Sequence, residues 1–401
     1  MDRFQDIRPY NDAEVRPVLD SLMESRAMLD SIARFYAPRL SRWLPWLMRA
    51  LARRTLRRQL RGVETVAAMQ HVIASYMDKM IEDTTSSLTT SGLENLVPGR
   101  SYVFISNHRD IAMDPAFVNY MLYHAGFETL QIAIGDNLLK KPFVADLMRL
   151  NKSFIVKRSV KGRDLLAALR QLSEYIHHCI ETDNNVWIAQ REGRAKDGID
   201  RTDPALLKML AIAHRKLPLR ESLGRLHIVP VTLSYQYDAC DLLKAQELHA
   251  QSSGQGFAKD DDTDVRSIVT GMMGQKGAVH VAFGTELEIE SDDPDRVAAQ
   301  IDAQIRANYK VRDINFLALE RLLALGALTE NEAARASLQL AAWSAGAQGG
   351  AGEDATKGSP EDREARQAFE RRYAGVEESL RVIWLRSYAN ALLVSAAGDS
   401  R

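Results

Sequence analysis

Apolar positions along the chain follow two patterns. Over residues 12–85 they recur every three or four residues with few turn signals, which is the period of amphipathic helices. Over residues 88–315 short apolar runs alternate with helical segments, and beyond residue 315 the helical spacing returns. The pattern predicts three regions: an N-terminal helical region at 1–86, a central domain at 87–315 and a C-terminal helical extension at 316–401.

Six short apolar runs in the central region have the composition of buried strands. They span residues 102–106, 130–134, 153–156, 185–189, 228–234 and 278–283. Strands separated by helices of this length predict an α/β fold, in which a central sheet, mostly parallel or mixed, is flanked by helices. Polar side chains that do chemistry are then expected at the strand ends.

The C-terminal region is predicted to hold helical segments joined by a linker. An amphipathic segment begins at Phe316, and residues 344–361 are rich in Gly, Ala and Ser, a composition typical of flexible linkers. A final helix is expected from about Arg363 to Ala396. We expect it to pack back on the domain, and an oligomer contact fits the same pattern.

Composition and charge narrow the classes of protein. The chain has 401 residues, of which 46% are apolar and 26% are charged, as in globular proteins with a substantial core. Its formal net charge of -1 predicts no general attraction to nucleic acid. Cys179 and Cys240 lack the spacing of a disulfide framework or a zinc site, which favours a protein of the reducing cytoplasm.

Neither a secretory signal nor a membrane-spanning helix is expected. The first residues include acids and no apolar core, unlike a signal peptide. Nowhere do roughly 18 uncharged apolar residues run together, as a spanning helix requires. We therefore expect a cytoplasmic chain that does not cross a bilayer.

Residues 31–63 carry nine arginines and no acidic residue. The arginines alternate with leucines and with Trp43 and Trp46, and basic, aromatic-rich amphipathic helices bind anionic lipid headgroups. We expect this segment to hold the protein on the inner face of the membrane as a peripheral protein. A bundle helix that buries its leucines would show the same pattern, whereas nucleic-acid binding would need an aromatic platform or grooved basic motif that is missing.

The first strand of the central domain leads to Asn107 and His108, and two acids, Asp110 and Asp114, follow within two helical turns. A histidine can remove the proton of an alcohol while a neighbouring carboxylate holds its tautomer. The spacing predicts a general base with an orienting acid. A histidine at a helix start beside two solvated acids is the alternative.

Charged residues also follow the later strands. Lys157 and Arg158 end the third strand, and a basic turn follows the fourth. Its charged residues and glycine are Arg191, Glu192, Gly193, Arg194 and Lys196. Guanidinium groups bind phosphate oxygens through two parallel bonds, and glycine lets the backbone approach. The turn predicts a phosphate-binding site, and a solvated charged loop is the alternative.

The order of these blocks resembles the glycerolipid acyltransferase superfamily, which includes the glycerol-3-phosphate and lysophosphatidic acid acyltransferases. The likeness covers roughly residues 88–283. The family block Asn-His-x4-Asp is matched in kind by Asn107 and His108 with a following acid. An aromatic-aliphatic strand ending in arginine, a Glu-Gly-x-Arg block and a Val-Pro-Val type strand are matched by residues 154–158, 187–194 and 228–231.

The chain departs from the family pattern twice. The family spacing places the acid at Met113, whereas the available acids are Asp110 and Asp114. We favour Asp114 as the partner of His108 and expect Asp110 to cap a helix that begins near Ile111. The third block is also one residue shorter than the family form, because its glycine directly precedes its arginine.

The resemblance implies an acyl transfer without a covalent acyl-enzyme. His108 would remove the proton of an acceptor hydroxyl, which attacks the thioester of acyl-CoA or acyl carrier protein, while Asp114 holds the imidazole. The acceptor would be glycerol 3-phosphate or lysophosphatidic acid, and neither a metal nor a further cofactor is expected. Its phosphate and the other substrate groups would meet Asn107, Arg109, Arg158, Arg191, Glu192, Gly193, Arg194 and Lys196.

Two other classes of function fit the same residues. One is a lipid-binding module that kept the fold and lost catalysis through the displaced acid. The other is a hydrolase of acyl thioesters or esters, in which His108 would activate water. The basic turn favours a phosphorylated acceptor over water.

Overall fold

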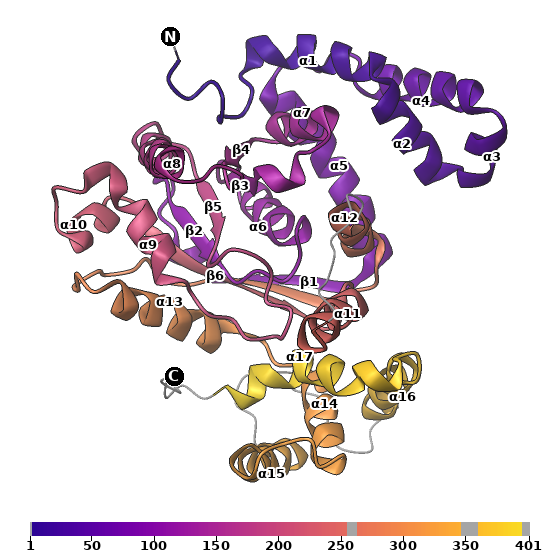
Figure 1. The fold of residues 1–401 in the computed structure, drawn as a ribbon, viewed down its shortest axis with the longest axis vertical. Coiled ribbons are helices and arrows are strands. Elements are labelled where there is room, and N and C mark those ends of the chain that lie inside the picture. Colours follow the sequence, from indigo (N-terminus) through magenta and orange to yellow (C-terminus); the bar gives the residue numbers. More distant parts are fainter. Residues whose placement is uncertain (1, 255–262, 346–359, 395–401) are drawn as a thin grey trace.

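The computed structural model describes residues 2–254, 263–345 and 360–394, and a seven-stranded sheet lies at its centre (Figure 1). Its strands are β1 (Thr85–Ser91), β2 (Val103–Ser106), β3 (Gln131–Gly135), β4 (Ser153–Val156), β5 (Val186–Ala189), β6 (Ile228–Tyr235) and β7 (Gly277–Phe283). Their order is β1-β7-β6-β2-β5-β3-β4. All neighbours are parallel except the antiparallel pair β6 and β7. The predicted α/β fold with a mixed sheet is confirmed, and all six predicted strands form within about one residue of their expected bounds.

Helices cover both faces of the sheet (Figure 1). One face packs against α8 (Arg163–Glu181), α9 (Pro204–Leu210), α10 (Leu219–Gly224) and α13 (Pro294–Asn308), and the other against α5 (Val66–Thr84) and α6 (Met113–His124). Val103 and Ile105 face the first group, whereas Phe104 faces the second. This alternation follows from the two-residue period of a strand.

The sequence did not predict β1, because its residues Thr85–Ser91 include a single leucine among threonines and serines. The strand lies at the edge of the sheet and pairs only with β7. Its hydroxyls bond the buried ring of His280, with Thr89 Oγ1 2.8 Å from Nδ1 and Ser91 Oγ 3.0 Å from Nε2. A polar edge strand of this kind lacks the apolar alternation by which strands are found.

The N-terminal region is helical, as expected. It consists of α1 (Asp12–Glu24), α2 (Arg26–Tyr36), α3 (Pro38–Trp43), α4 (Pro45–Gln59) and α5. Val15, Leu19 and Met28 pack with Leu150 of α7 (Pro142–Leu150) in one apolar cluster. The first helices are therefore anchored to the central domain, whereas α3 buries no residue.

The C-terminal region contains α14 (Asp313–Ala324), α15 (Glu330–Ser344), α16 (Pro360–Ala374) and α17 (Arg381–Leu393). The prediction of one final helix from Arg363 to Ala396 is wrong, because the structure has two helices there, α16 and α17. The chain turns after Ala374 and buries Val376 and Leu380 beside Trp384. Most of the predicted linker, residues 346–359, and the last predicted helical residues, 395 and 396, lie outside the described residues. Two further helices, α11 (Asp241–Ser252) and α12 (Thr263–Met273), connect β6 to β7.

Candidate active site

The central strand β2 delivers His108 to the carboxyl end of the sheet. Asn107, just before it, is fully buried, and its amide bonds both backbone groups of Leu233 in β6, at 3.0 Å to the carbonyl and 2.8 Å from the N–H. The same amide nitrogen donates to Asp200 Oδ2 at 3.1 Å. Asn107 therefore fixes the strand end that carries the histidine.

His108 pairs with Asp114, the second residue of α6. Nδ1 of the imidazole lies 2.9 Å from Asp114 Oδ2, and the carboxylate is fully buried. The same oxygen accepts hydrogen bonds from the backbone N–H groups of Arg109 and Asp110, at 2.6 and 2.9 Å. A carboxylate held in this way makes Nδ1 the protonated nitrogen and leaves Nε2 to exchange a proton.

Asp110 does not pair with the imidazole and is not the N-cap residue of α6, which is Ala112, but it bonds the backbone at the start of that helix. Its Oδ1 accepts from the N–H groups of Ala112 and Met113, at 3.0 and 2.9 Å. The helix begins at Met113, two residues later than the sequence predicted. Burial, with the charge of Asp114 nearby, raises the pKa of Asp110.

Two aromatic residues of this site were not assigned a role from the sequence. Tyr235, at the end of β6, donates its hydroxyl to Asp114 Oδ1 at 2.7 Å, and burial raises its pKa well above the ordinary value. Trp187 of β5 packs edge-on against His108, with ring centroids 5.8 Å apart. The sequence signals were the place of Tyr235 at the end of an apolar strand and that of Trp187 in the block 187–194, but the contacts themselves depend on which strands become neighbours.

A cavity of about 1740 Å³ opens beside His108. Much of its wall is apolar and comes from α1, α2, α4 and α5, including Leu22, Met28, Leu56 and Met77. The volume and lining suit a long apolar ligand with a polar end near the histidine.

The loop after β5, residues 190–203, here called the arginine loop, brings charge to the same cavity. Arg191, Glu192, Gly193, Arg194 and Lys196 line the cavity with His108 and Arg158. Gly193 has φ of 79°, a conformation that favours glycine. The loop thus carries most of the predicted phosphate site.

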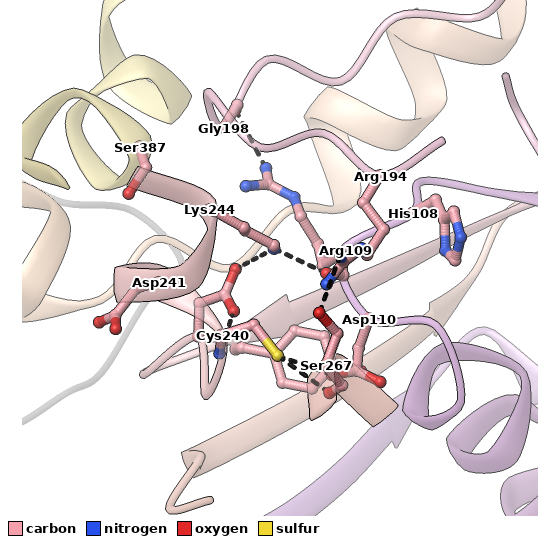
Figure 2. Close-up of polar contacts among 12 residues, drawn as sticks. His108, Arg109, Asp110, Arg194, Gly198, Cys240, Asp241, Lys244, Ser267 and Ser387 are labelled. Atoms are coloured by element: carbon pink, nitrogen blue, oxygen red, sulfur yellow. Dashed lines mark hydrogen bonds and ion pairs between the residues drawn. The ribbon is translucent and has the colours of Figure 1, made fainter. Parts of the chain in front are cut away.

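The cations of this site differ in their protein partners. Arg158 contacts the exposed Glu192 at 3.3 Å, and Lys196 contacts the buried Glu247 at 2.5 Å. Arg191 is 3.9 Å from Asp197. Arg194 donates from Nη2 to Ser267 Oγ at 3.4 Å, while its Nη1 is buried without a hydrogen-bond partner (Figure 2). A buried guanidinium nitrogen without a partner carries an uncompensated desolvation cost.

Asn107 and Arg109, predicted to bind substrate, are absent from the cavity wall. Arg109 donates from Nη2 to Gly198 O at 3.1 Å and to Asp200 Oδ2 at 2.7 Å, and its guanidinium lies over the ring of Tyr309. Both side chains join segments of the protein to one another. The structure therefore gives them a framework role.

Residues 2–254, 263–345 and 360–394 contain no group of three His, Cys, Asp or Glu side chains that could hold a metal ion. Over the same ranges, the structure has no helix with the length and apolar character needed to span a membrane.

Residues 87–234, which include β2, the arginine loop and most of β6, match the family Acyltransferase. This part of the chain is therefore similar to acyltransferase domains. The match covers less than half of the chain, and together with the curated relatives described next it supports a similarity to the glycerolipid acyltransferase superfamily.

The relatives include the glycerol-3-phosphate acyltransferase of Pseudomonas syringae pv. syringae strain B728a, which is 25% identical over 249 residues. That alignment covers 61% of this chain and 29% of the relative. The glycerol-3-phosphate acyltransferase of Pseudomonas putida strain GB-1 is 26% identical over 240 residues, covering 60% of this chain and 27% of the relative. The chain thus spans less than a third of the length of either relative.

Among solved structures, the 1-acyl-sn-glycerophosphate acyltransferase from Thermotoga maritima matches with 11% sequence identity and a TM-score of 0.35. The superposition covers 71% of this chain and 97% of the other.

Proposed function

We propose that the chain transfers a fatty acyl group from acyl-CoA or acyl carrier protein to a hydroxyl of a phosphorylated glycerol acceptor. The observation that carries this proposal is that His108, oriented by Asp114, lines the same cavity as Arg158, Arg194 and Lys196. Glycerol 3-phosphate and lysophosphatidic acid both combine a hydroxyl with a phosphate, as such a site requires.

The proposed reaction begins when His108 Nε2 removes the proton of the acceptor hydroxyl. The oxygen attacks the thioester carbonyl, the tetrahedral intermediate loses the thiolate, and the imidazolium returns the proton to the sulfur. Asp114 accepts the hydrogen bond of Nδ1 throughout and stabilises the imidazolium. Much of the rate gain would come from holding two substrates in one geometry.

The acceptor phosphate would bind Arg194, with Arg158, Arg191 and Lys196 nearby. Arg194 is favoured because its side chain is held by one long hydrogen bond, 3.4 Å from Nη2 to Ser267 Oγ, whereas Lys196 is already neutralised by Glu247. The acyl chain of the donor would occupy the apolar part of the cavity.

We also propose that the N-terminal helices bind anionic lipid headgroups on the inner face of the membrane. Tyr36, Trp43 and Trp46 are 75%, 84% and 64% exposed, and eight of the nine arginines of residues 31–63, all but Arg61, lie on the same helices α2, α3 and α4. Glu24 and Asp30 pair with three of those arginines, Arg49, Arg53 and Arg57. Exposed tryptophans beside cationic residues are typical of a headgroup contact.

The test is product analysis of the purified protein with labelled acyl-CoA or acyl carrier protein and, in parallel, glycerol 3-phosphate, lysophosphatidic acid or buffer. Labelled lysophosphatidic or phosphatidic acid that disappears in His108→Ala would support the transferase. Free fatty acid alone would support the hydrolase. No turnover with any pair, together with retained binding of lipid vesicles, would support the binding module.

A further inference from the structure

Helix α17 packs directly on the arginine loop, although it lies outside the residues that match the acyltransferase family. Asn390 is buried and donates from Nδ2 to the carbonyl of Asp197 at 2.8 Å. The neighbouring Gly198 has φ of 78°, and a Cβ built on it would lie 2.0 Å from the carbonyl oxygen of Ser387. The backbones of the loop and of α17 therefore approach too closely for any side chain at position 198.

The arginine loop is joined on its other side to residues 107–114, the segment after β2 that carries His108 and is here called the base segment. The N–H of Ala195 donates to the carbonyl of His108 at 2.7 Å. The carbonyl of Gly198 accepts from Arg109 Nη2 at 3.1 Å, a contact drawn as a dashed line in Figure 2. The loop is thus held between the base segment and α17.

Helix α17 also reaches the base segment by a second route. Tyr388 donates its hydroxyl to Asp241 Oδ2 at 2.7 Å and accepts from the N–H of Asp238 at 3.1 Å. The carboxylate of Asp238 pairs with Lys244, whose Nζ donates to the carbonyl of Arg109 at 2.6 Å (Figure 2). Helix α17 therefore supports both the arginine loop and the base segment.

We propose that α17 sets the affinity for the phosphorylated acceptor, with Asn390 and Gly198 as positioning residues. They hold the arginine loop so that Arg194 and Lys196 stay at the distance from His108 that an acceptor must span. The inference rests on the proposed function for the identity of the acceptor. Its physical basis is that residues 190–203 contain no helix or strand of their own, so contacts with neighbouring elements decide how well the loop is ordered.

The first experiment compares Asn390→Ala with Gln339→Ala in the full chain. Gln339 of α15 also donates one amide hydrogen bond to a backbone carbonyl of α17, Leu392 O, at 2.8 Å, but it does not touch the loop. With palmitoyl-CoA as donor, we expect Asn390→Ala to raise KM for glycerol 3-phosphate or lysophosphatidic acid about three- to tenfold, as the loss of one hydrogen bond would. The turnover number and KM for palmitoyl-CoA should stay within about twofold, and Gln339→Ala should leave all three unchanged.

The second experiment follows amide hydrogen exchange of residues 190–203 and requires no turnover. We expect faster exchange in Asn390→Ala than in the wild type, with unchanged exchange in Gln339→Ala. If the wild type transfers no acyl group but the exchange result holds, the proposed function fails and the role of α17 in ordering the loop stands. Unchanged loop exchange, or a loss of turnover number without a rise in acceptor KM, in a folded Asn390→Ala protein would overturn the inference.

Discussion

The two loops that form the candidate site are built in opposite ways. In the loop after β2, residues 107–114, the Asp114 carboxylate accepts from Arg109, Asp110 and Tyr235 and contacts His108. In the arginine loop, Arg194 keeps a buried nitrogen without a partner, and Arg158 pairs with an exposed Glu192. A group that moves a proton needs a fixed direction, whereas groups that bind a substrate need unused hydrogen-bonding capacity until the substrate arrives.

The strongest test of this comparison removes the base. His108→Ala should lower kcat/KM about a thousandfold, because general base catalysis typically contributes two to four orders of magnitude. Its melting temperature should change little, since Asp114 keeps its two backbone donors and Tyr235. Turnover within tenfold of the wild type would remove His108 from the mechanism.

The arginine loop is tested by Arg194→Ala. We expect KM for the phosphorylated acceptor to rise about 10- to 100-fold, because a hydrogen bond to a charged group contributes about 1.5–3 kcal/mol. Arg191→Ala is the matched control on the same loop, since Arg191 has only a 3.9 Å contact with Asp197, and its effect should be several-fold smaller. Steady-state kinetics at varied acceptor concentration measure both, and equal effects would contradict the special place of Arg194.

A smaller effect is expected when the support of Asp114 is reduced. Tyr235→Phe removes one buried donor to the carboxylate and should lower the free energy of unfolding by about 1–3 kcal/mol, with a several-fold loss of kcat. Tyr120→Phe is the control, because Tyr120 donates to Asp78 at 2.8 Å at the surface and should cost less than about 1 kcal/mol. Denaturant unfolding measures the loss of unfolding free energy in both variants. An equal loss in Tyr235→Phe and Tyr120→Phe would show that the buried hydrogen bond to Asp114 adds no more stability than the surface one.

The last effect concerns stability alone and involves Lys276, whose charge interacts with Asp110 of the loop after β2. Its Nζ donates to Thr84 Oγ1 at 3.0 Å and to Gly274 O at 2.9 Å, and burial lowers its pKa to about 8. Between that pH and the ordinary lysine value of about 10.5, the unfolded chain binds more protons than the folded one. The free energy of unfolding should therefore rise with pH in this range relative to Lys276→Met.

Chemical denaturation of both proteins at several pH values from about 8 to 10.5 measures this difference. A gain of about 1–3 kcal/mol for the wild type would fit the lowered pKa. Parallel curves for the two proteins would show that Lys276 has an ordinary pKa.

The sequence predicted the parts of this molecule that depend on local pattern. Six strands, the helical ends and the cluster of charge at strand ends follow from apolar period and turn residues. The sequence also favoured Asp114 over Asp110 as the partner of His108, the arrangement that the structure has.

Contacts between distant segments could not be predicted in the same way. Tyr235 reaches Asp114, 121 positions away, only because β6 lies beside β2. The framework role of Arg109 depends on Asp200 and Tyr309, and β1 forms because β7 offers it a partner. Such pairings depend on the order of the strands in the sheet, and no local sequence pattern encodes that order.

The single hydrogen bond from Ala195 to the carbonyl of His108 has a consequence for regiochemistry. It ties the backbone next to the base to the loop that carries the proposed phosphate site, so the span between proton acceptor and phosphate is nearly constant. The hydroxyls of a glycerol phosphate lie at different distances from its phosphorus atom. If the proposed acceptor binds in this way, a fixed span would favour reaction at one carbon position of the acceptor and keep the other out of reach.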